Sequence, residues 1–214
     1  IKPNGGTWNG TTANTTVTVS AATILTATAT ANALEFSAQT LDAGTYNAAY
    51  SASFTGASNG TGTYTYAVNS VTCGGTAVTA SSGKYNGLSL SGTTISGTPT
   101  KAGTYVFSIK ATDSNSGVTK DANITIVINK ATVNAPTNVQ VSTAGAVTWT
   151  ASNNATGYQI SIDGSTWETA TNGIDYNSKI TAATGSRTVY VRAVNSDTTN
   201  YTTPSANVSK AVTV

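Results

Sequence analysis

The chain has 214 residues, of which only 8% are Asp, Glu, Lys or Arg, and it has a formal net charge of +2 and no histidine. Since about a quarter of the residues of a typical globular protein are charged, solubility here must come from Thr, Ser, Asn and Gly. Without histidine, Ser–His–Asp or Cys–His catalysis and any His-containing metal site are excluded. The scattered basic residues argue against nucleic-acid binding. No apolar run is long enough to predict membrane insertion.

Thr favours strands, while Asn and Gly favour turns, so the composition predicts an all-β protein. Residues 1–33 are the least informative. Turn-forming residues surround Trp8, and Thr16–Ser20 alternates like a strand. We expect residues 1–33 to be a short N-terminal β segment or the tail of an upstream module. We also expect the chain to be a fragment of a longer polypeptide.

Residues 34–130 are expected to form the first β-sandwich, centred on Gly87–Asp113. In that stretch Tyr105, Phe107 and Ile109 alternate with polar or smaller residues, as in a half-buried strand. Pro99 cannot donate a hydrogen bond to a sheet, so it should lie in a turn. The predicted strands are Ala33–Ser37, Ala49–Thr55, Thr63–Val71, Leu88–Ser91, Thr93–Ile95, Thr104–Ala111 and Ala122–Asn129.

The motifs of this first segment occur in the order typical of one family. They are LDAGTYNAAY at Leu41–Tyr50, GTYTY at Gly62–Tyr66, GLSL at Gly87–Leu90, ISGTPT at Ile95–Thr100, AGTY at Ala102–Tyr105 and ATD at Ala111–Asp113. The segment resembles the bacterial cadherin-like domain of immunoglobulin fold, a module of surface and secreted proteins. The resemblance covers about ninety residues. It departs from the family at Leu41–Asp42, where the family usually has Leu-Pro.

Lys130–Thr137 is expected to link this domain to a second β-sandwich over residues 131–214. Its predicted strands are Asn138–Ser142, Ala146–Thr150, Gly157–Asp163, Asp175–Ile180, Thr188–Asn195 and Ala206–Val214, with a hairpin turn at Asp163–Gly164. The whole protein is thus predicted to be two tandem immunoglobulin-like β-sandwiches with a short N-terminal β segment.

The motifs APTNVQVS, VTWTAS, GYQISIDG and VYVRAVN of the second segment are similar to those of a bacterial fibronectin type III domain. The resemblance implies that Trp149 lies in the core between the sheets. The tyrosine-corner position of the family is Arg187 here, so that corner hydrogen bond should be absent.

Candidates for catalysis are few. A glycosidase needs two carboxylates across a cleft, and the eight carboxylates of this chain are scattered along both segments. Cys73, the single cysteine, has no nearby charge in the sequence that would activate it, so we expect a buried side chain. The single cysteine also excludes an internal disulfide. The sequence therefore predicts a protein that is not an enzyme and needs no cofactor.

Calcium binding is an alternative that the residues leave open. Calcium needs six to eight oxygen ligands, and cadherin-like modules often bind it in Asp-rich loops. Asp113, in ATDSNSG, and Asp121 are the candidate metal ligands. An equally simple interpretation is that Asp113 organises its own turn.

Carbohydrate binding is the second open alternative. Trp8 and Trp167 both lie in turn-like surroundings, GGTWNG and GSTWET, and are the candidate ligand-binding residues. If they bind a glycan, at least one of them should be exposed beside polar side chains. If they only stabilise the fold, both should be packed.

The function we expect from these observations is non-catalytic. The chain would be a monomeric extracellular segment of a bacterial surface or secreted protein, acting as an adhesion or spacer module between flanking domains. Its partner would be a protein or glycan on a host or neighbouring cell. The alternative is an accessory carbohydrate-binding module of a secreted polysaccharide-degrading enzyme.

Overall fold

A computed structural model describes residues 33–180 and 185–213 of the chain. All described residues belong to one compact unit, residues 33–214. The predicted N-terminal β segment, with Trp8 and Thr16–Ser20, lies outside the described residues. The described residues are almost entirely β-structure and contain two hydrophobic cores, one for each predicted sandwich.

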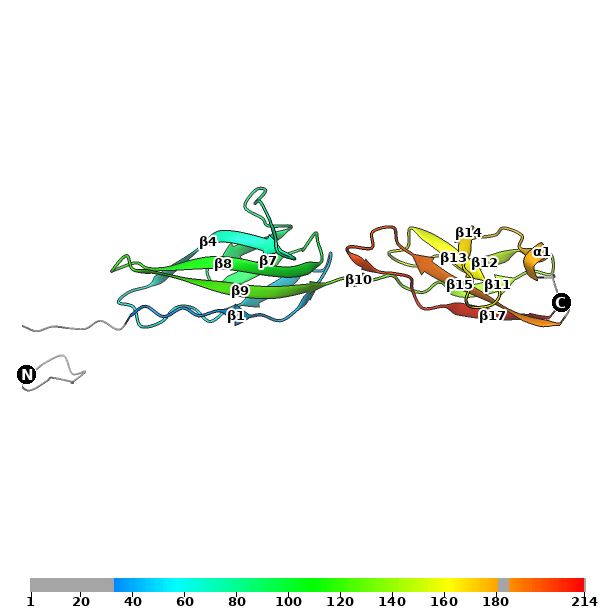
Figure 1. Ribbon diagram of the computed structural model, residues 1–214, viewed down its shortest axis with the longest axis horizontal. Coiled ribbons are helices and arrows are strands. Elements are labelled where there is room, and N and C mark those ends of the chain that lie inside the picture. The colour runs from blue at the N-terminus through cyan, green and yellow to red at the C-terminus, as the bar shows by residue number, and fades with distance from the viewer. Residues whose placement is uncertain (1–32, 181–184, 214) are drawn as a thin grey trace, which may run out of the picture. The chain divides into compact units, whose positions relative to one another are not determined.

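The first sandwich consists of two sheets (Figure 1). The larger sheet has the order β1-β9-β8-β4-β5, with β2 also paired to β9, and the smaller has the order β3-β7-β6. The strands are β1 (Gln39–Thr40), β2 (Gly44–Thr45), β3 (Tyr50–Ser53), β4 (Tyr64–Cys73), β5 (Thr76–Ala77), β6 (Leu88–Ser91), β7 (Thr94–Gly97), β8 (Gly103–Asp113) and β9 (Thr119–Asn129). Within this sandwich the pairings are antiparallel except those of β1 and β2 with β9, which are parallel.

The central strand β8 confirms the predicted alternation. Tyr105, Phe107 and Ile109 are completely buried, while the residues between them are only half-buried. The neighbouring strand β9 contributes Ile124, Ile126 and Ile128 to the same core. Each fully buried aliphatic or aromatic side chain stabilises the fold by roughly 1.5–3 kcal/mol, so these two strands supply much of the core energy. Pro99 is buried in the loop after β7, as expected for a residue that cannot donate to a sheet.

The predicted strand Ala33–Ser37 is wrong. Only Glu35 makes a β-bridge there, to Ser58. The alternation that suggested a strand instead reflects the burial of Leu34 and Phe36, whose side chains point into the core. Phe36 packs against the rings of Phe54 and Tyr66 at centroid distances of 5.6 and 5.7 Å. Alternating burial thus occurs here without the backbone pairing that defines a strand.

The second sandwich contains a four-stranded sheet of order β14-β13-β15-β17, a pair β11-β12 and a short pair β10-β16 (Figure 1). Its strands are β10 (Ala131–Thr132), β11 (Thr137–Val141), β12 (Val147–Thr150), β13 (Gly157–Ser161), β14 (Glu168–Ala170), β15 (Ser186–Val194), β16 (Tyr201–Thr202) and β17 (Val208–Thr213). The predicted strands match this set apart from Asp175–Ile180, and the sequence did not predict β14 or the two short strands β10 and β16.

Trp149 lies in the second core, as predicted, with 5% of its surface exposed. Its ring packs against Tyr158 at a centroid distance of 5.1 Å. The Asn172 side chain bonds both backbone groups of Trp149, accepting from its N–H and donating to its carbonyl. Among the described residues, the indole Nε1 of Trp149 has no hydrogen-bond partner although it is buried.

The predicted strand Asp175–Ile180 is also wrong, because this segment forms the short helix α1 (Asn177–Ile180). The carboxylate of Asp175 accepts a hydrogen bond of 2.6 Å from the Asn177 backbone N–H, as helix-capping side chains do. Tyr176 packs against the core and Ile180 is buried in it. The two residues are four positions apart, which is the spacing of residues on one face of a helix. Two apolar residues at this spacing fit a strand and a helix equally well, and the cap decides between them.

The linker is partly ordered. Ala131 and Thr132 form the parallel pair β10-β16 with Tyr201 and Thr202 of the second sandwich. Within the described part of the chain, no helix is long and apolar enough to cross a membrane.

Candidate functional site

Trp167, the one of the two binding candidates that the structure describes, is half-buried in the loop directly before β14. The guanidinium carbon of Arg192, in β15, lies 3.9 Å from the centre of its ring. This is a cation–π contact, which covers one face of the indole. The Nε of Arg192 also donates a 2.9 Å hydrogen bond to the side-chain oxygen of Gln159. Trp167 is therefore neither fully packed nor freely exposed.

The loop before Trp167 is fixed by Asp163, at the predicted hairpin turn. Its carboxylate accepts hydrogen bonds from the backbone N–H groups of Thr166 and Ser165, at 2.7 and 2.8 Å, and from the hydroxyl of Ser161. These bonds, that of Thr166 foremost, lower the pKa of Asp163 well below its usual range. Asp163 is thus occupied in holding the hairpin that carries Trp167.

Arg192 and Gln159 lie directly opposite each other on the two central strands of the sheet, on its outer face. Their neighbours in sequence, Val191 and Ile160, form the next pair and point into the core. By strand register, the outer face around this pair also includes residues with hydroxyl groups, among them Thr169, Tyr190 and Ser209. The site is a polar surface around one cation and one indole, and its other residues are uncharged.

Asp113 ends β8 and lies on its inner face, with 1% of its surface exposed. Its carboxylate accepts hydrogen bonds from the backbone N–H groups of Thr61, Asn115 and Ser116 and from the Thr61 hydroxyl. The bond from the Thr61 backbone is the largest of these effects; together the hydrogen bonds outweigh the opposing effect of burial and lower the pKa of Asp113 to about 2. The carboxylate therefore organises its own turn and the facing loop.

Asp121, the second candidate calcium ligand, is exposed in β9 opposite Lys110. Lys110 is on the face of β8 opposite to Asp113, so the two aspartates project from opposite faces of the sheet. They do not form one site. The described residues contain no group of three or more Asp, Glu, Cys or His side chains that could hold a metal ion. Calcium binding stays a prediction.

Cys73 is buried at the end of β4, as predicted. Its thiol lies 3.9 Å from the carbonyl oxygen of Ala102, and it belongs to the first core. In the described part of the chain the one ion pair joins Lys179 and Glu168, which are both exposed.

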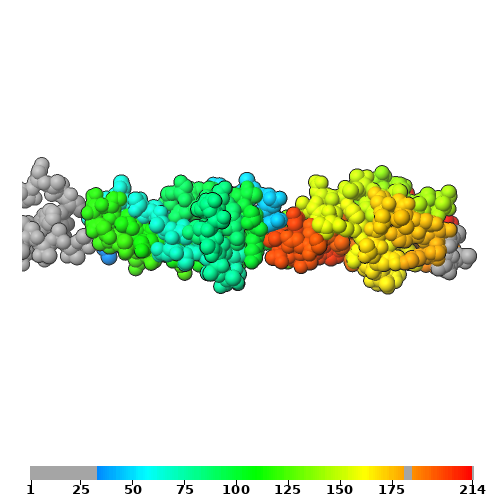
Figure 2. Space-filling model, turned by 90° about the horizontal axis from the view of Figure 1, so that it is seen from above, coloured from blue at the N-terminus to red at the C-terminus, as the bar shows by residue number. Residues whose placement is uncertain are grey.

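A second cluster of polar contacts joins the two sandwiches, and sequence analysis missed it. The side-chain oxygen of Asn200 accepts a 2.7 Å hydrogen bond from the backbone N–H of Ala102, in the first sandwich. The rings of Tyr46 and Tyr201 meet edge to face at 5.3 Å. The side-chain amine of Lys130 donates to the carbonyl of Thr198. The second sandwich makes these contacts through the segment between β15 and β16. In Figure 2 the orange-red residues of this segment lie beside blue and green residues of the first sandwich.

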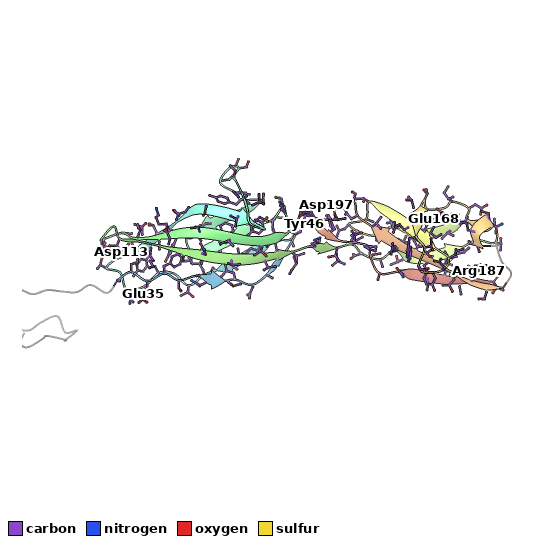
Figure 3. All side chains as sticks on the ribbon, in the orientation of Figure 1. Glu35, Tyr46, Asp113, Glu168, Arg187 and Asp197 are labelled. Atoms are coloured by element: carbon purple, nitrogen blue, oxygen red, sulfur yellow. The ribbon has the colours of Figure 1, made fainter. Side chains whose placement is uncertain are left out.

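Asp197 holds Asn200 in place for this contact. It accepts hydrogen bonds from the side-chain amide and the backbone N–H of Asn200, at 2.7 and 3.1 Å. The side-chain bond from Asn200 is the main reason why the pKa of Asp197 is lowered. Burial, and then Tyr201 and Asp197, raise the pKa of the neighbouring Tyr46. Figure 3 shows Tyr46 and Asp197 close together, while Asp113 lies at the other end of the first sandwich.

The alternation of GYQIS and VYVRAV does place Gln159 and Arg192 away from the core, and this signal was available in the sequence. That they face each other depends on the pairing of β13 with β15. For Asn200 and Tyr46 no local signal exists, because their partners are 98 and 155 residues away.

No protein-family model matches the chain, and no curated protein matches it. Several solved structures are similar to the chain, among them two of low sequence identity. The fibronectin(III)-like modules of CbhA from Clostridium thermocellum are 16% identical, with 83% of this chain and 90% of that chain covered and a TM-score of 0.27. A chimeric titin Z1Z2-Z1Z2 tandem carrying an exogenous GRGDS peptide from fibronectin is 13% identical, with 82% and 92% covered and a TM-score of 0.22.

Proposed function

We propose that the chain is a non-catalytic extracellular segment of a bacterial surface or secreted protein, which spaces and displays the domains around it. One observation carries the proposal: the hydrogen bond from Ala102 N–H to the Asn200 side chain, which joins the two sandwiches directly. Asn200 is itself held by Asp197, so its oxygen is pre-oriented for this bond.

A spacer must resist bending between its domains. Domains joined by a linker usually move relative to each other unless their interface is large. Here the linker strand β10 is paired, and a tyrosine pair and two hydrogen bonds link the sandwiches. These contacts support a joint that bends less than a free linker of the same length would.

The non-catalytic part of the proposal is supported by what the carboxylates do. Asp113, Asp163 and Asp197 all accept backbone hydrogen bonds that organise loops. Such bonds favour the ionised form, which cannot donate a proton as a general acid must. Each sandwich also has a core of its own, and no disulfide can form in a chain with one cysteine, so sheet packing carries the stability.

The test replaces Asn200 with alanine and measures hydrogen exchange of the Ala102 amide by NMR. We expect exchange to become at least about tenfold faster, since a lost hydrogen bond of about 1.4 kcal/mol corresponds to that factor. Small-angle scattering should show a wider range of distances between the sandwiches. Asn207→Ala, at an exposed asparagine in the same sandwich, is the control. An unchanged Ala102 exchange rate in the Asn200→Ala variant would contradict the proposed joint.

A second candidate function is an accessory carbohydrate-binding module, and the half-buried Trp167 beside polar side chains favours it. The test is retention of the protein on a panel of soluble and insoluble polysaccharides, with Trp167→Ala and Trp8→Ala as variants. Retention that either substitution abolishes supports this function and identifies the tryptophan involved. If no polysaccharide retains the protein, the spacer proposal stands alone.

A further inference from the structure

We infer that Arg192, supported by Trp167 and Gln159, binds the carboxylate of an acidic polysaccharide on the outer face of the β14-β13-β15-β17 sheet. The inference rests on the second candidate function above and names both the residue that recognises the ligand and the chemical class of the glycan. It is independent of the proposed joint between the sandwiches.

The guanidinium of Arg192 is held in a defined orientation before any ligand arrives. Trp167 supports it from one side at 3.9 Å, and Gln159 fixes its Nε at 2.9 Å. Among the described residues, the two terminal nitrogens of Arg192 donate no hydrogen bond to another protein group, so they remain available as donors to a ligand. A planar guanidinium fixed in this way loses little side-chain entropy when it forms two parallel hydrogen bonds to a carboxylate.

The charge of Arg192 is not compensated within the described part of the chain. The ion pair in this part of the chain joins Lys179 and Glu168, and Arg192 forms none. Its cross-strand neighbour Gln159 and the nearby Thr169 and Tyr190 are uncharged. Partial burial removes some of the hydration of Arg192 and so lowers its pKa. A ligand carboxylate would supply the counter-charge that the protein lacks here.

The surroundings of Arg192 favour a glycan over a peptide or a nucleic acid. β13 and β15 are the two central strands of the sheet, so their backbone groups are already paired and cannot bind a peptide as an added strand. A nucleic acid needs several basic residues together, and the outer-face positions around Arg192 carry none. The hydroxyl and amide groups present are those that bind sugar hydroxyls.

The experiment is affinity electrophoresis of the 214-residue chain in gels containing polygalacturonate, with a neutral glucan as the comparison polymer. The chain should be retarded by polygalacturonate and not by the glucan. Arg192→Gln should weaken the apparent affinity about tenfold or more, and Arg192→Lys, which keeps the charge but not the fork, should weaken it by a smaller factor. Arg187→Gln removes the same charge from the same strand and should leave binding unchanged.

Three results would overturn the inference. The first is no retardation by polygalacturonate, or a loss of equal size in Arg187→Gln, which would indicate general attraction to charge. The second is retention on neutral glycans that depends on Trp167 but not on Arg192; the carbohydrate-binding function would then survive without the acidic ligand. The third is equal, Arg192-dependent binding of polyglutamate, which would assign the site to acidic peptides.

Thermal unfolding of each variant checks that Arg192→Gln stays folded. The Trp167→Phe variant keeps an aromatic ring beneath the guanidinium and should retain binding.

Discussion

The Trp149 side chain has two opposite effects on the stability of the second sandwich. Its ring fills the second core against Tyr158, yet its buried Nε1 has no hydrogen-bond partner among the described residues. A buried donor without a partner costs about 1–3 kcal/mol, so the indole stabilises the fold by its area and loses part of that gain through its nitrogen. A smaller aromatic residue would keep most of the packing and remove the unpaired donor.

We therefore expect Trp149→Ala to lower the free energy of unfolding of the second sandwich by about 3–5 kcal/mol, as large core deletions do. Trp149→Phe should cost less than half as much. Urea unfolding followed by circular dichroism measures both values. A Trp149→Ala variant with an unchanged transition would contradict the placement of Trp149 in the core, and equal losses in the two variants would contradict the role given to Nε1.

The lowered pKa of Asp113 predicts how the stability of the first sandwich changes in acid. Its pKa is about 2 in the folded protein and close to 4 in an unfolded chain. Because the folded-state pKa is the lower one, the carboxylate stabilises the fold fully above about pH 4. This stabilisation is lost as the pH falls from about 4 to about 2.

The melting temperature of the first sandwich should thus fall over this pH range in the wild-type protein. Asp113→Asn should melt lower at pH 7 and vary less between pH 4 and 2, because the amide does not titrate. The second sandwich provides an internal control, since its Asp163 and Asp197 are unchanged in the variant. If both proteins showed the same dependence on pH, Asp113 would not be its source.

At the scale of elements, the turn of the ISGTPT motif is determined by close backbone contact. Gly97, at the end of β7, has φ +140°. A Cβ atom added there would collide with the carbonyl oxygen of Gly87, and one added at Gly87 would collide with that of Thr98. Gly92, in the turn between β6 and β7, has φ +54° but open space around it. A substitution at Gly92 therefore tests backbone strain alone, while one at Gly97 adds a steric conflict with the backbone.

Gly92→Ala should cost about 1–2 kcal/mol, the price of a left-handed conformation for an L-residue. Gly97→Ala should cost clearly more, because the backbone contact must also be relieved by movement of the strand. Chemical unfolding of the first sandwich measures both. Equal losses would mean that the approach of the Gly87 carbonyl is not limiting.

The hairpin between β13 and β14 shows how one loop positions a potential site. Asp163 binds the backbone N–H groups of Ser165 and Thr166, and Trp167 follows directly. The loop geometry therefore places the indole beneath Arg192 of the neighbouring strand β15. The candidate site depends on a turn and a strand pair together, and neither would create it alone.

At the scale of the described molecule, the two sandwiches are joined by a few specific contacts. Tyr46 and Tyr201 contribute the aromatic part, and such edge-to-face pairs are worth about 0.5–1.5 kcal/mol beyond their buried area. This is a modest energy, but it acts between sandwiches that are otherwise connected by a short linker.

A double-mutant cycle should recover this coupling. Tyr46→Ala and Tyr201→Ala together should lower the free energy of unfolding by about 0.5–1.5 kcal/mol less than the sum of the two single effects. Tyr46→Ala combined with Tyr190→Ala, on the outer face of the second sandwich, should be additive. Additivity in the Tyr46–Tyr201 pair would mean that the two rings do not interact in solution.

The sequence by itself determined the all-β class, most strands, the buried face of β8 and the burial of Cys73. These follow from periodicity and residue type, which act over a few residues, whereas the core position of Trp149 was implied by the resemblance to a fibronectin type III domain. The strand predictions for Ala33–Ser37 and Asp175–Ile180 were wrong, because the spacing of buried residues in each segment is compatible with more than one backbone conformation.

Only the tertiary structure decided which side chains meet. The pairing of β13 with β15 places Gln159 beside Arg192, and the hairpin brings Trp167 beneath it. The fold likewise separates Asp113 from Asp121 and joins Asn200 to Ala102. Such contacts depend on strand register and on the meeting of residues far apart in the chain, and a local pattern contains no information about either.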